Sequence, residues 1–433
     1  MTEKSLLQMR HALFVSFQYP PDASSSGVLR TLKYTRYLAE HGWRVTVVSP
    51  DASCYETIDD ASLSNIPDTV KVVRTRYLDT KLHLGVRGRY PAIAALPDRF
   101  IGWLPWALAA GTRIGLSDPV DLIYSTSPPA TAHLIAWCLA RRLKKPWVAD
   151  FRDPWFEEPA EEGAPSGRVF RKLDRWLEQR VVADCMHVVT TTQSMQNMLL
   201  TRYASLARSK FSVIPNGYDE FDFMALPLPA NSSTDHLCIV HAGNINPGFR
   251  DPMRLVSAIK HAAELGIVEP DKIRVRFLGG GAYAESNELR LALIDSGLSA
   301  NVEMISRLPY SDALRQLAAA DVLLLLQASE DTRGLVPAKL YEYLRLQKPV
   351  LALTLPGEVS ALLEQTGGGF TADPADSAQV VLVLGEIYRR WREGTLVRGG
   401  ASQTLVKQYE RRALAGKLAA IFACLADASP GPG

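Results

Sequence analysis

The residues best placed to do chemistry lie in one strand–loop–helix stretch late in the chain. An apolar run over residues 321–326 is typical of a buried parallel strand, and a short polar loop follows it. Because proline suits a first helical turn, a helix is expected to begin near Pro337. Lys339 and Glu342 are three residues apart and therefore share one face of that helix. A cation and a carboxylate beyond the carboxyl end of a strand can hold a phosphate and a ribose hydroxyl.

A simpler interpretation of the same two residues is a surface ion pair three positions apart on a helix. Other parts of the chain are needed to choose between a ligand site and a surface ion pair. Leu335 and Val336, which end the polar loop, would line the same ligand site.

Small residues follow two other expected strands in this half of the chain. A strand over 237–241 leads into Gly243 and Asn244, and Arg250 comes shortly before a helix. A strand over 273–278 is followed by three glycines that include Gly280. Glycine lets the backbone approach a ligand closely, and Arg250 is favoured as a phosphate ligand over a solvated arginine at a helix start.

The first half of the chain shows the same alternation of strands and helices. A strand over 12–17 precedes a loop of small residues that ends at Gly27, and Gly27 either faces a ligand or only makes a turn. A later strand over 146–150 runs into Arg152 and Asp153. An Arg and an Asp exposed at a strand's carboxyl end lie where such folds keep their chemistry, although Asp153 could merely cap the next segment.

These elements predict an α/β protein with two Rossmann-like domains that face each other across a cleft. We expect a first domain over 1–216, a second domain over 236–405, and a helical tail over 406–433 that could pack back on the first domain. An aperiodic stretch over 217–235 would be the linker.

Composition narrows the classes of function. The chain has 433 residues, 47% of them hydrophobic and 22% charged, as in soluble globular proteins. A net charge of +2 gives no field that would attract nucleic acid. The five cysteines are scattered without a CxxC pair, which favours reduced thiols in a cytosolic protein. The first residues lack the apolar core of a signal peptide, and no apolar run is long enough to cross a bilayer.

One stretch could still contact a membrane surface. Basic and aromatic residues alternate over 81–113, which suits an interfacial helix on anionic lipid. The alternative is a helix that packs on its own domain with solvated arginines. We therefore expect a cytoplasmic protein. Whether it also contacts the inner leaflet of the membrane stays open.

Three sequence motifs, in this order and spacing, resemble the retaining GT-B glycosyltransferases of family 4. They are Asp150-Phe151-Arg152-Asp153-Pro154-Trp155, Ile214-Pro215-Asn216-Gly217-Tyr218-Asp219 and Pro337-Ala338-Lys339-Leu340-Tyr341-Glu342-Tyr343-Leu344. The resemblance spans nearly the whole chain. It implies transfer of a sugar from a UDP- or GDP-sugar to a glycan or lipid-linked acceptor, in polysaccharide or cell-surface glycan synthesis.

The resemblance also implies that the N-terminal domain binds the acceptor and the C-terminal domain binds the nucleotide sugar, and it implies residue roles. Lys339 and Arg250 match the two cations that clamp the donor diphosphate, and Glu342 matches the glutamate that holds the donor ribose. Gly243 matches the glycine whose loop faces the diphosphate, with Asn244 where relatives often have arginine. Arg307 falls in the base-contacting loop.

The chain departs from the family pattern at two places. The first glutamate of the paired-Glu motif falls at Gly334, with Glu330 and Asp331 close by but out of register. Where many relatives carry a catalytic histidine this chain has Arg152-Asp153, so Asp153 is assigned to the acceptor site.

Sugar transfer builds negative charge on the leaving diphosphate, which fixed cations stabilise in a water-poor site. No DxD motif follows an apolar strand, so the sequence predicts a metal-independent enzyme without a cofactor, in which arginine, lysine and helix N-termini supply the positive charge. Two other functions stay open. One is a sugar-nucleotide 2-epimerase, which uses the same architecture, and the other is an inactive nucleotide- or glycan-binding homologue.

Overall fold

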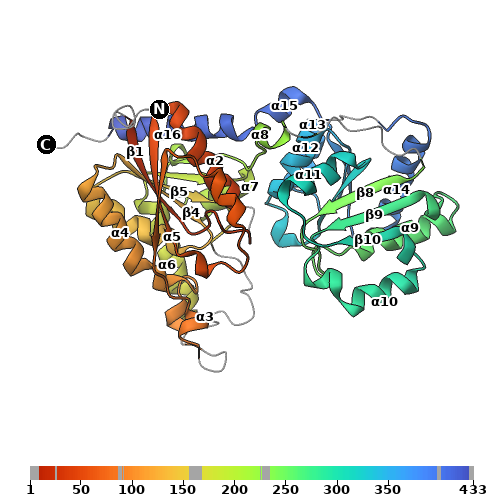
Figure 1. Cartoon of the computed structure of the whole chain (residues 1–433), viewed down its shortest axis with the longest axis horizontal. Helices are drawn as coiled ribbons and strands as arrows, with labels where there is room; N and C mark the ends of the chain where they lie inside the picture. Colours follow the sequence, from red (N-terminus) through yellow and green to blue (C-terminus); the bar gives the residue numbers. More distant parts are fainter. Residues whose placement is uncertain are drawn as a thin grey trace. The chain divides into compact units, whose positions relative to one another are not determined.

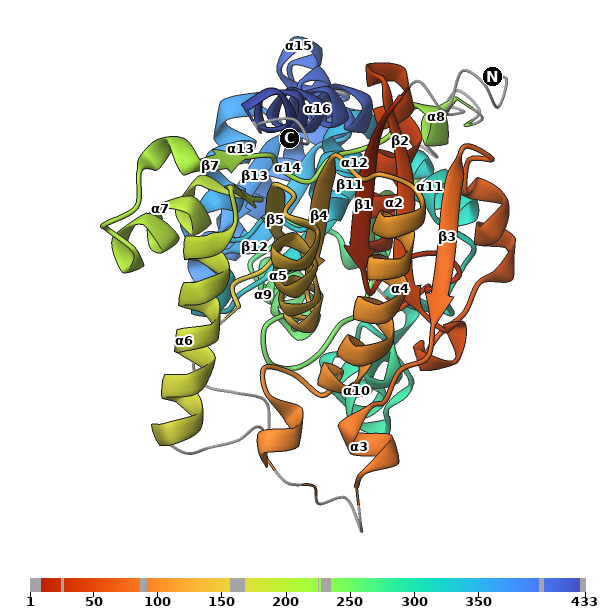
Figure 2. The same ribbon diagram turned by 90° about the vertical axis from the view of Figure 1, so that its left-hand side faces the viewer.

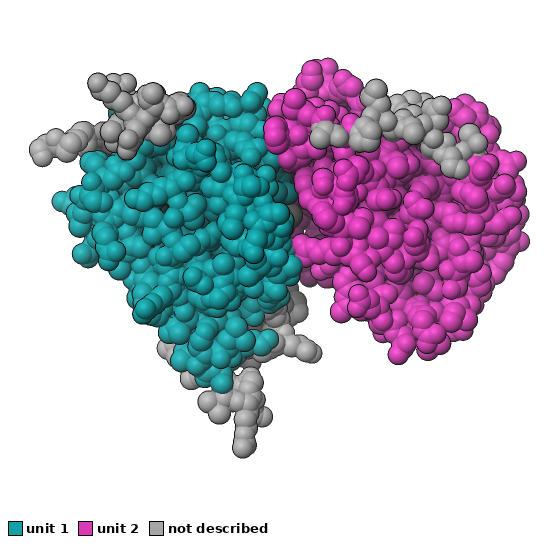
Figure 3. Space-filling model, in the orientation of Figure 1, with its two compact units in different colours: residues 1–215, 411–433 teal, residues 216–410 magenta. Residues whose placement is uncertain are grey.

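The computed structural model describes residues 9–24, 27–85, 90, 92–155, 168–224, 226, 235–396 and 401–428. The chain divides into two compact units, residues 1–215 with 411–433 and residues 216–410 (Figure 3). Arg87 and Arg89 of the basic and aromatic stretch lie outside the described residues. Among the residues that are described, no helix is long and apolar enough to cross a membrane.

Unit 1 is built on a seven-stranded parallel sheet in the order β3-β2-β1-β4-β5-β6-β7. The strands are β1 (Arg10–Ser16), β2 (Trp43–Pro50), β3 (Val70–Thr75), β4 (Leu122–Ser127), β5 (Trp147–Phe151), β6 (His187–Thr190) and β7 (Phe211–Val213). In the central pair, Phe14 of β1 lies opposite Tyr124 of β4 and their rings stack at 4.3 Å. Since both faces are covered, the strands read as nearly continuous apolar runs.

Helices cover both faces of this sheet. They are α2 (Gly27–Tyr37), α3 (Thr80–His83), α4 (Leu104–Ser117), α5 (Thr131–Leu143), α6 (Arg168–Asp184), α7 (Gln193–Arg202) and α16 (Arg411–Ala428), with 3₁₀ turns at Leu38–His41, Ala52–Cys54, Asp60–Asn65, Ala92–Ala95, Ile101–Trp103 and Arg208–Lys210. Helices α4, α5 and α6 lie on one face (Figure 2). Helices α2 and α16 pack together on the other.

Unit 2 is built on a six-stranded parallel sheet in the order β10-β9-β8-β11-β12-β13. The strands are β8 (Leu237–Ala242), β9 (Ile273–Leu278), β10 (Val302–Ile305), β11 (Val322–Gln327), β12 (Val350–Thr354) and β13 (Gly369–Ala372). The apolar run predicted to be a buried strand is β11, and all of its residues are buried.

The helices of unit 2 also form two layers (Figure 1). They are α8 (Glu220–Phe223), α9 (Met253–Glu264), α10 (Asn287–Ser296), α11 (Tyr310–Ala319), α12 (Ala338–Leu346), α13 (Glu358–Thr366), α14 (Ser377–Arg392) and α15 (Gln403–Lys407), with 3₁₀ turns at Pro270–Lys272, Ala282–Glu285, Ser299–Asn301 and Glu330–Thr332. Helices α9, α10 and α14 cover one face, and α11, α12 and α13 cover the other.

The start of the stretch expected to be a linker is part of this packing. Tyr218 and Phe223 are buried in the cluster beneath α11 to α13, and Asp219 caps α8 by accepting from the N–H of Phe221. The aperiodic appearance of residues 217–224 therefore hides a short packed helix.

In each sheet the order of the strands reverses once, between β1 and β4 in unit 1 and between β8 and β11 in unit 2. The helices that follow the two strands at such a point leave on opposite faces of the sheet. The carboxyl ends of those strands therefore border a crevice where open α/β sheets bind ligands. The fold class predicted from the sequence, α/β with two Rossmann-like domains, is confirmed.

Candidate functional site

The reversal point of unit 2 is bridged by helix α12. Lys339 Nζ donates to the carbonyl oxygen of Ala242 at 2.6 Å, and the N–H of Ala242 donates to Tyr343 Oη at 3.1 Å. Lys339 and Tyr343 are four residues apart and so lie on one face of α12. This pair of bonds fastens the first turns of α12 to the carboxyl end of β8.

Lys339 occupies an environment that disfavours its charge. Burial, and then the positive charge of Arg250, lower the pKa of Lys339 to about 7, although Glu342 acts in the opposite direction. The ion pair with Glu342 that the sequence left open does not form, because Lys339 Nζ bonds to Ala242 and lies beside His241. Instead Glu342 accepts a hydrogen bond from Tyr310 Oη at 2.8 Å.

His241 is a site residue that sequence reasoning missed. Its Nδ1 lies 2.9 Å from the carbonyl oxygen of Leu324, which assigns the ring proton to Nδ1. Its Nε2 is 3.5 Å from Lys339 Nζ. Burial, and then Lys339, lower the pKa of His241 well below its usual value. The neutral ring therefore turns the lone pair of Nε2 toward the side-chain nitrogen of Lys339.

Gly243 lies directly after β8 and needs to be glycine. Its φ is +107°, which L side chains rarely adopt, and an added Cβ would lie 3.0 Å from Lys339 Nζ. Its N–H donates to the carbonyl of Leu278, so the loops after β8 and β9 are joined. The backbone thus leaves open the space beside the ammonium group.

Arg250 is positioned by a tight loop. Asn246 Oδ1 accepts from the N–H groups of Gly248 and Phe249, and the carbonyl of Phe249 accepts from the N–H of Ala328 just after β11. Arg250 is half-buried and forms no ion pair with any described residue. Because its charge acts on Lys339 and on His241, the two cations predicted to clamp a diphosphate lie close together.

The other predicted residues of this half surround the same edge of the sheet. Gly280 is packed so closely that an added Cβ would meet Ala284 at 2.6 Å, and its carbonyl accepts from the N–H of Ile245. Arg307, after β10, is exposed. The remaining predicted residues here are the exposed Asn244, half-buried Leu335 and buried Val336.

The two residues near the missing glutamate do not replace it. Glu330 is paired with Arg333 at 2.9 Å and is exposed, as is Asp331. The Arg333 guanidinium is held in turn by the carbonyl of Pro356. Glu330 thus belongs to a surface ion pair.

Two predicted residues belong to unit 1. Gly27 is the first residue of α2, and Asp153 is exposed just after β5. Arg152 was expected to be exposed but is only 6% exposed, because its guanidinium is bonded to backbone carbonyls at the end of β4. His133 is fully buried, with Nδ1 2.7 Å from Ser125 Oγ, and burial lowers its pKa to about 3.

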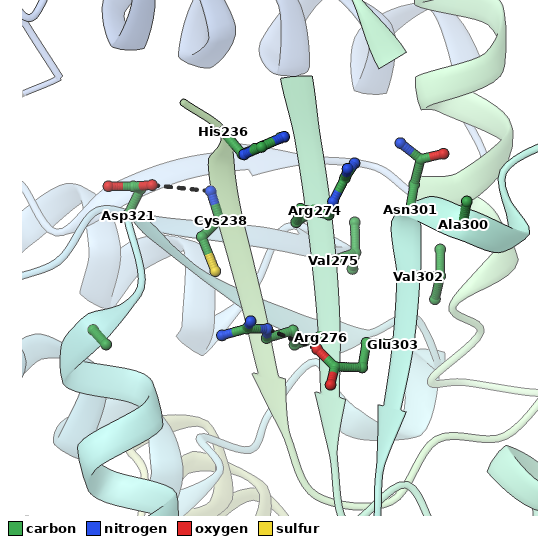
Figure 4. Close-up of a pocket in the computed structure, with 11 residues that line it drawn as sticks. His236, Cys238, Arg274, Val275, Arg276, Ala300, Asn301, Val302, Glu303 and Asp321 are labelled. Atoms are coloured by element: carbon green, nitrogen blue, oxygen red, sulfur yellow. Dashed lines mark hydrogen bonds and ion pairs between the residues drawn. The ribbon is translucent and has the colours of Figure 1, made fainter. Parts of the chain in front are cut away.

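A separate hollow in unit 2 lies away from these residues. This hollow is one of those that unit 2 contains, has a volume of about 570 Å³ and lies along β8, β9 and β10 toward their amino ends, where Arg274 and Arg276 point from the sheet (Figure 4). Arg276 donates to Glu303 at 2.9 Å. None of the predicted site residues lines it. Among the described residues, no group of three or more His, Cys, Asp or Glu side chains could hold a metal ion.

The family described as "Glycosyl transferase 4-like domain" matches residues 27–217. A relative from Pseudomonas aeruginosa, named as the probable glycosyltransferase WbjE, is 33% identical over 123 residues. That alignment covers 28% of this chain and 30% of the relative, so it spans less than a third of the relative's length.

Solved structures share the fold over nearly the whole chain. Sucrose-phosphate synthase from Thermosynechococcus elongatus aligns with a TM-score of 0.68 and 13% identity, covering 97% of this chain and 100% of that one. HepE from Anabaena, solved in complex with UDP, aligns with a TM-score of 0.67 and 15% identity, covering 96% and 100%. At these identities the likeness establishes the fold.

Proposed function

We propose that this chain, which carries a glycosyl transferase 4-like domain over residues 27–217 and has the GT-B fold, is a glycosyltransferase that uses a nucleotide diphosphate sugar. The donor would be a UDP- or GDP-sugar, and the acceptor a glycan or a lipid-linked saccharide. The observation that carries the proposal is the pair of cations, Lys339 and Arg250, gathered without a bonded carboxylate at the reversal point of unit 2.

The chemistry of the reaction suits this arrangement. When the bond from the anomeric carbon to the diphosphate breaks, negative charge grows on the leaving oxygen. Lys339, Arg250 and the N-terminus of α12 would stabilise that charge, and they need no reorganisation because they are already fixed. Glu342, whose carboxylate accepts from Tyr310, would hold a donor ribose hydroxyl, and Arg307 would contact the base.

The finer assignments rest on the family resemblance. The reaction would proceed with retention of configuration and transfer a hexose, and Asp153 in unit 1 would contact the acceptor. HepE, which shares the fold, was solved with UDP, and this supports a uridine nucleotide as the first donor to test. The product would enter polysaccharide or cell-surface glycan synthesis.

Binding of UDP and GDP to a Lys339→Ala variant tests the proposal. A charged hydrogen bond to phosphate contributes roughly 1.5–3 kcal/mol, so we expect the affinity to fall about 10- to 100-fold. Thermal shift and calorimetry would measure it. Lys260→Ala, which removes an exposed lysine of α9, is the matched control and should bind as the wild type does.

Product analysis separates the competing functions. A transferase consumes the sugar nucleotide and releases the nucleoside diphosphate only when an acceptor is added. Conversion of a UDP-sugar to an isomer without acceptor would identify an epimerase, and tight binding without turnover on a broad acceptor panel would identify an inactive homologue. Unchanged UDP and GDP affinity in Lys339→Ala would refute the phosphate site.

A cytoplasmic location with contact to the inner leaflet is part of the proposal. Leu82 and Leu84, beside α3, are 68% and 49% exposed, and Lys81 next to them is exposed as well. Apolar groups beside a cation suit an anionic lipid surface. Co-sedimentation with phosphatidylglycerol vesicles should fall about five-fold in a Leu82→Ser/Leu84→Ser variant. Equal sedimentation of the variant and the wild type would exclude this contact.

A further inference from the structure

His241 is a fully buried histidine near the carboxyl end of β8, and both of its ring nitrogens have partners in the fold. Nδ1 lies 2.9 Å from the carbonyl oxygen of Leu324 in β11, and Nε2 lies 3.5 Å from Lys339 Nζ in α12. A carbonyl oxygen can only accept, so in the neutral ring Nδ1 carries the proton and Nε2 offers a lone pair. The ring therefore connects a central strand of the sheet to the side chain of Lys339.

Another buried histidine shows that such a partner does not follow from burial alone. His133 of unit 1 is also fully buried, and its Nδ1 lies 2.7 Å from Ser125 Oγ. Its Nε2, however, has no hydrogen-bond partner among the described residues. Packing around a buried histidine can thus leave Nε2 unmatched, and the contact between His241 and Lys339 is a particular feature of the unit 2 site.

Lys339 has three N–H donors when it is charged, and the fold supplies acceptors for two of them. Nζ donates to the carbonyl oxygen of Ala242 at 2.6 Å, and Nε2 of His241 is the second acceptor. An added Cβ on Gly243 would lie 3.0 Å from Nζ, so this glycine leaves space beside the nitrogen. Two fixed acceptors on neighbouring residues of β8 determine the direction of the third N–H, which has no acceptor among the described residues.

The titratable groups around Lys339 leave its charge poorly compensated. Burial and the positive charge of Arg250, in the loop after β8, lower the pKa of Lys339 to about 7, and Glu342 of α12 acts in the opposite direction. Tyr343, also on α12, stays neutral because burial raises its pKa. His241 is neutral as well, because burial and Lys339 lower its pKa. Among these four groups, only His241 lies within hydrogen-bond distance of Nζ.

We propose that His241 is a positioning residue for Lys339, whose Nε2 lone pair keeps the ammonium group charged and directs it into the space beside Gly243, where a diphosphate binds. The identity of this ligand rests on the proposed function, whereas the contact between the two side chains does not. A neutral acceptor suits the role, because a carboxylate in its place would form an ion pair and compete with the phosphate for the ammonium group. The fold thereby fixes the position of the cation without neutralising it.

Nuclear magnetic resonance tests the contact in the full-length protein without any ligand. We expect the ¹⁵N shifts of His241 in the wild type to show the tautomer with the proton on Nδ1. In protein labelled with ¹³Cε-lysine, the signal that Lys339→Arg removes should titrate near pH 7 in the wild type and roughly one pH unit lower in His241→Asn. A proton on Nε2 would overturn the proposal, and so would a Lys339 titration that is the same with and without His241.

Two variants separate this role from a purely structural one. Asparagine can donate to the Leu324 carbonyl in place of Nδ1 but is too short to reach Lys339, whereas glutamine can place an oxygen near the position of Nε2. We expect His241→Gln to bind UDP within about threefold of the wild type at pH 8, and His241→Asn to bind it about tenfold more weakly. At pH 6 the loss in His241→Asn should shrink to about twofold, because Lys339 is then largely protonated in both proteins.

The opposite ranking would overturn the proposal, since strong binding by His241→Asn and weak binding by His241→Gln would mean that only the bond to Leu324 matters. An equal loss at both pH values would do the same, because a structural defect does not follow the protonation of Lys339. His261→Asn, which changes an exposed histidine of α9, is the control and should bind UDP as the wild type does.

Failure of this inference and failure of the proposed function give different results. If the phosphate site is wrong, Lys339→Ala binds UDP unchanged while the titration of Lys339 still depends on His241. If only the positioning role is wrong, Lys339→Ala loses UDP binding while His241→Asn binds UDP as tightly as the wild type.

Discussion

Two buried cations of this chain, Arg30 and Lys339, differ in the partners that surround them. Arg30 is 2% exposed, and although burial disfavours its charge, Asp150 raises its pKa above the usual value. The Arg30 guanidinium also donates hydrogen bonds to the carbonyls of Ile214 and Pro215, which connect α2 to the residues that follow β7. Lys339 has no such carboxylate, and burial lowers its pKa to about 7. A buried cation with a lowered pKa and no bonded carboxylate is a group whose charge a bound anion would stabilise.

Binding of a nucleoside diphosphate should therefore take up a proton at Lys339. In the free protein Lys339 loses its proton as the pH rises through about 7, and the bound diphosphate would favour the charged form. We expect the affinity for UDP to fall as the pH rises from 7 to 9, by up to about tenfold per unit. Calorimetry in buffers with different ionisation enthalpies measures the proton uptake.

Lys339→Arg is the control for this pH dependence, because arginine stays charged throughout the range. Its binding of UDP, even if weaker, should show no proton uptake between pH 7 and pH 9. A wild-type heat of binding that is the same in every buffer at pH 8 would contradict the assignment.

The sequence predicted the site only in part, for a physical reason. Lys339 and Glu342 could be found because a helix places residues three apart on one face. His241 could not, because a histidine inside an apolar strand looks like a core residue, and its partner is 98 positions away. Arg152 was expected at the surface, since neither the end of β4 nor Gln18 is near it in sequence.

At the scale of elements, apolar runs located strands, and β9 matches the expected bounds 273–278. Strand β13 was missed because glycines at 367–369 indicate a turn. In the structure Gly367, at φ +68°, caps α13, whereas a Cβ on Gly369 would meet the carbonyl oxygen of Val350 at 2.0 Å. Helix α10 was missed as well.

Gly243 directly follows β8 at the candidate site. The Gly243→Ala variant should separate the effect of backbone strain on stability from an effect on UDP binding. An L residue at φ +107° costs about 1–3 kcal/mol, and the new methyl group would lie 3.0 Å from Lys339 Nζ. We expect lower stability in urea together with weaker UDP binding. Gly266→Ala, at φ +68° with nothing within 4 Å, should lose stability and bind UDP normally. If both variants bind equally well, Gly243 has no role at the site.

At the scale of the whole molecule, the chain enters unit 2 at Asn216 and returns to unit 1 at Arg411. Its last helix, α16, packs on α2 and completes the core on that face of the unit 1 sheet. Phe422 is fully buried against Phe14, Trp43 and Tyr124, with ring centroids 6.2, 5.3 and 5.9 Å apart. The stability of the first unit thus depends on residues that follow the second unit in the chain.

Phe422→Ala should therefore destabilise unit 1, which begins some 400 residues earlier in the chain. Removing a buried phenylalanine typically costs about 3–5 kcal/mol, because the lost burial is added to the cavity left behind. Trp43 contacts the Phe422 ring, so its fluorescence reports the unfolding of unit 1. The midpoint of unfolding should move to a lower urea concentration. Lys417→Ala, exposed on the same helix, should leave it in place. A loss of unfolding free energy below about 1 kcal/mol would contradict this prediction, because a cavity among three aromatic rings should cost more. The unit 1 sheet would then keep its core without α16.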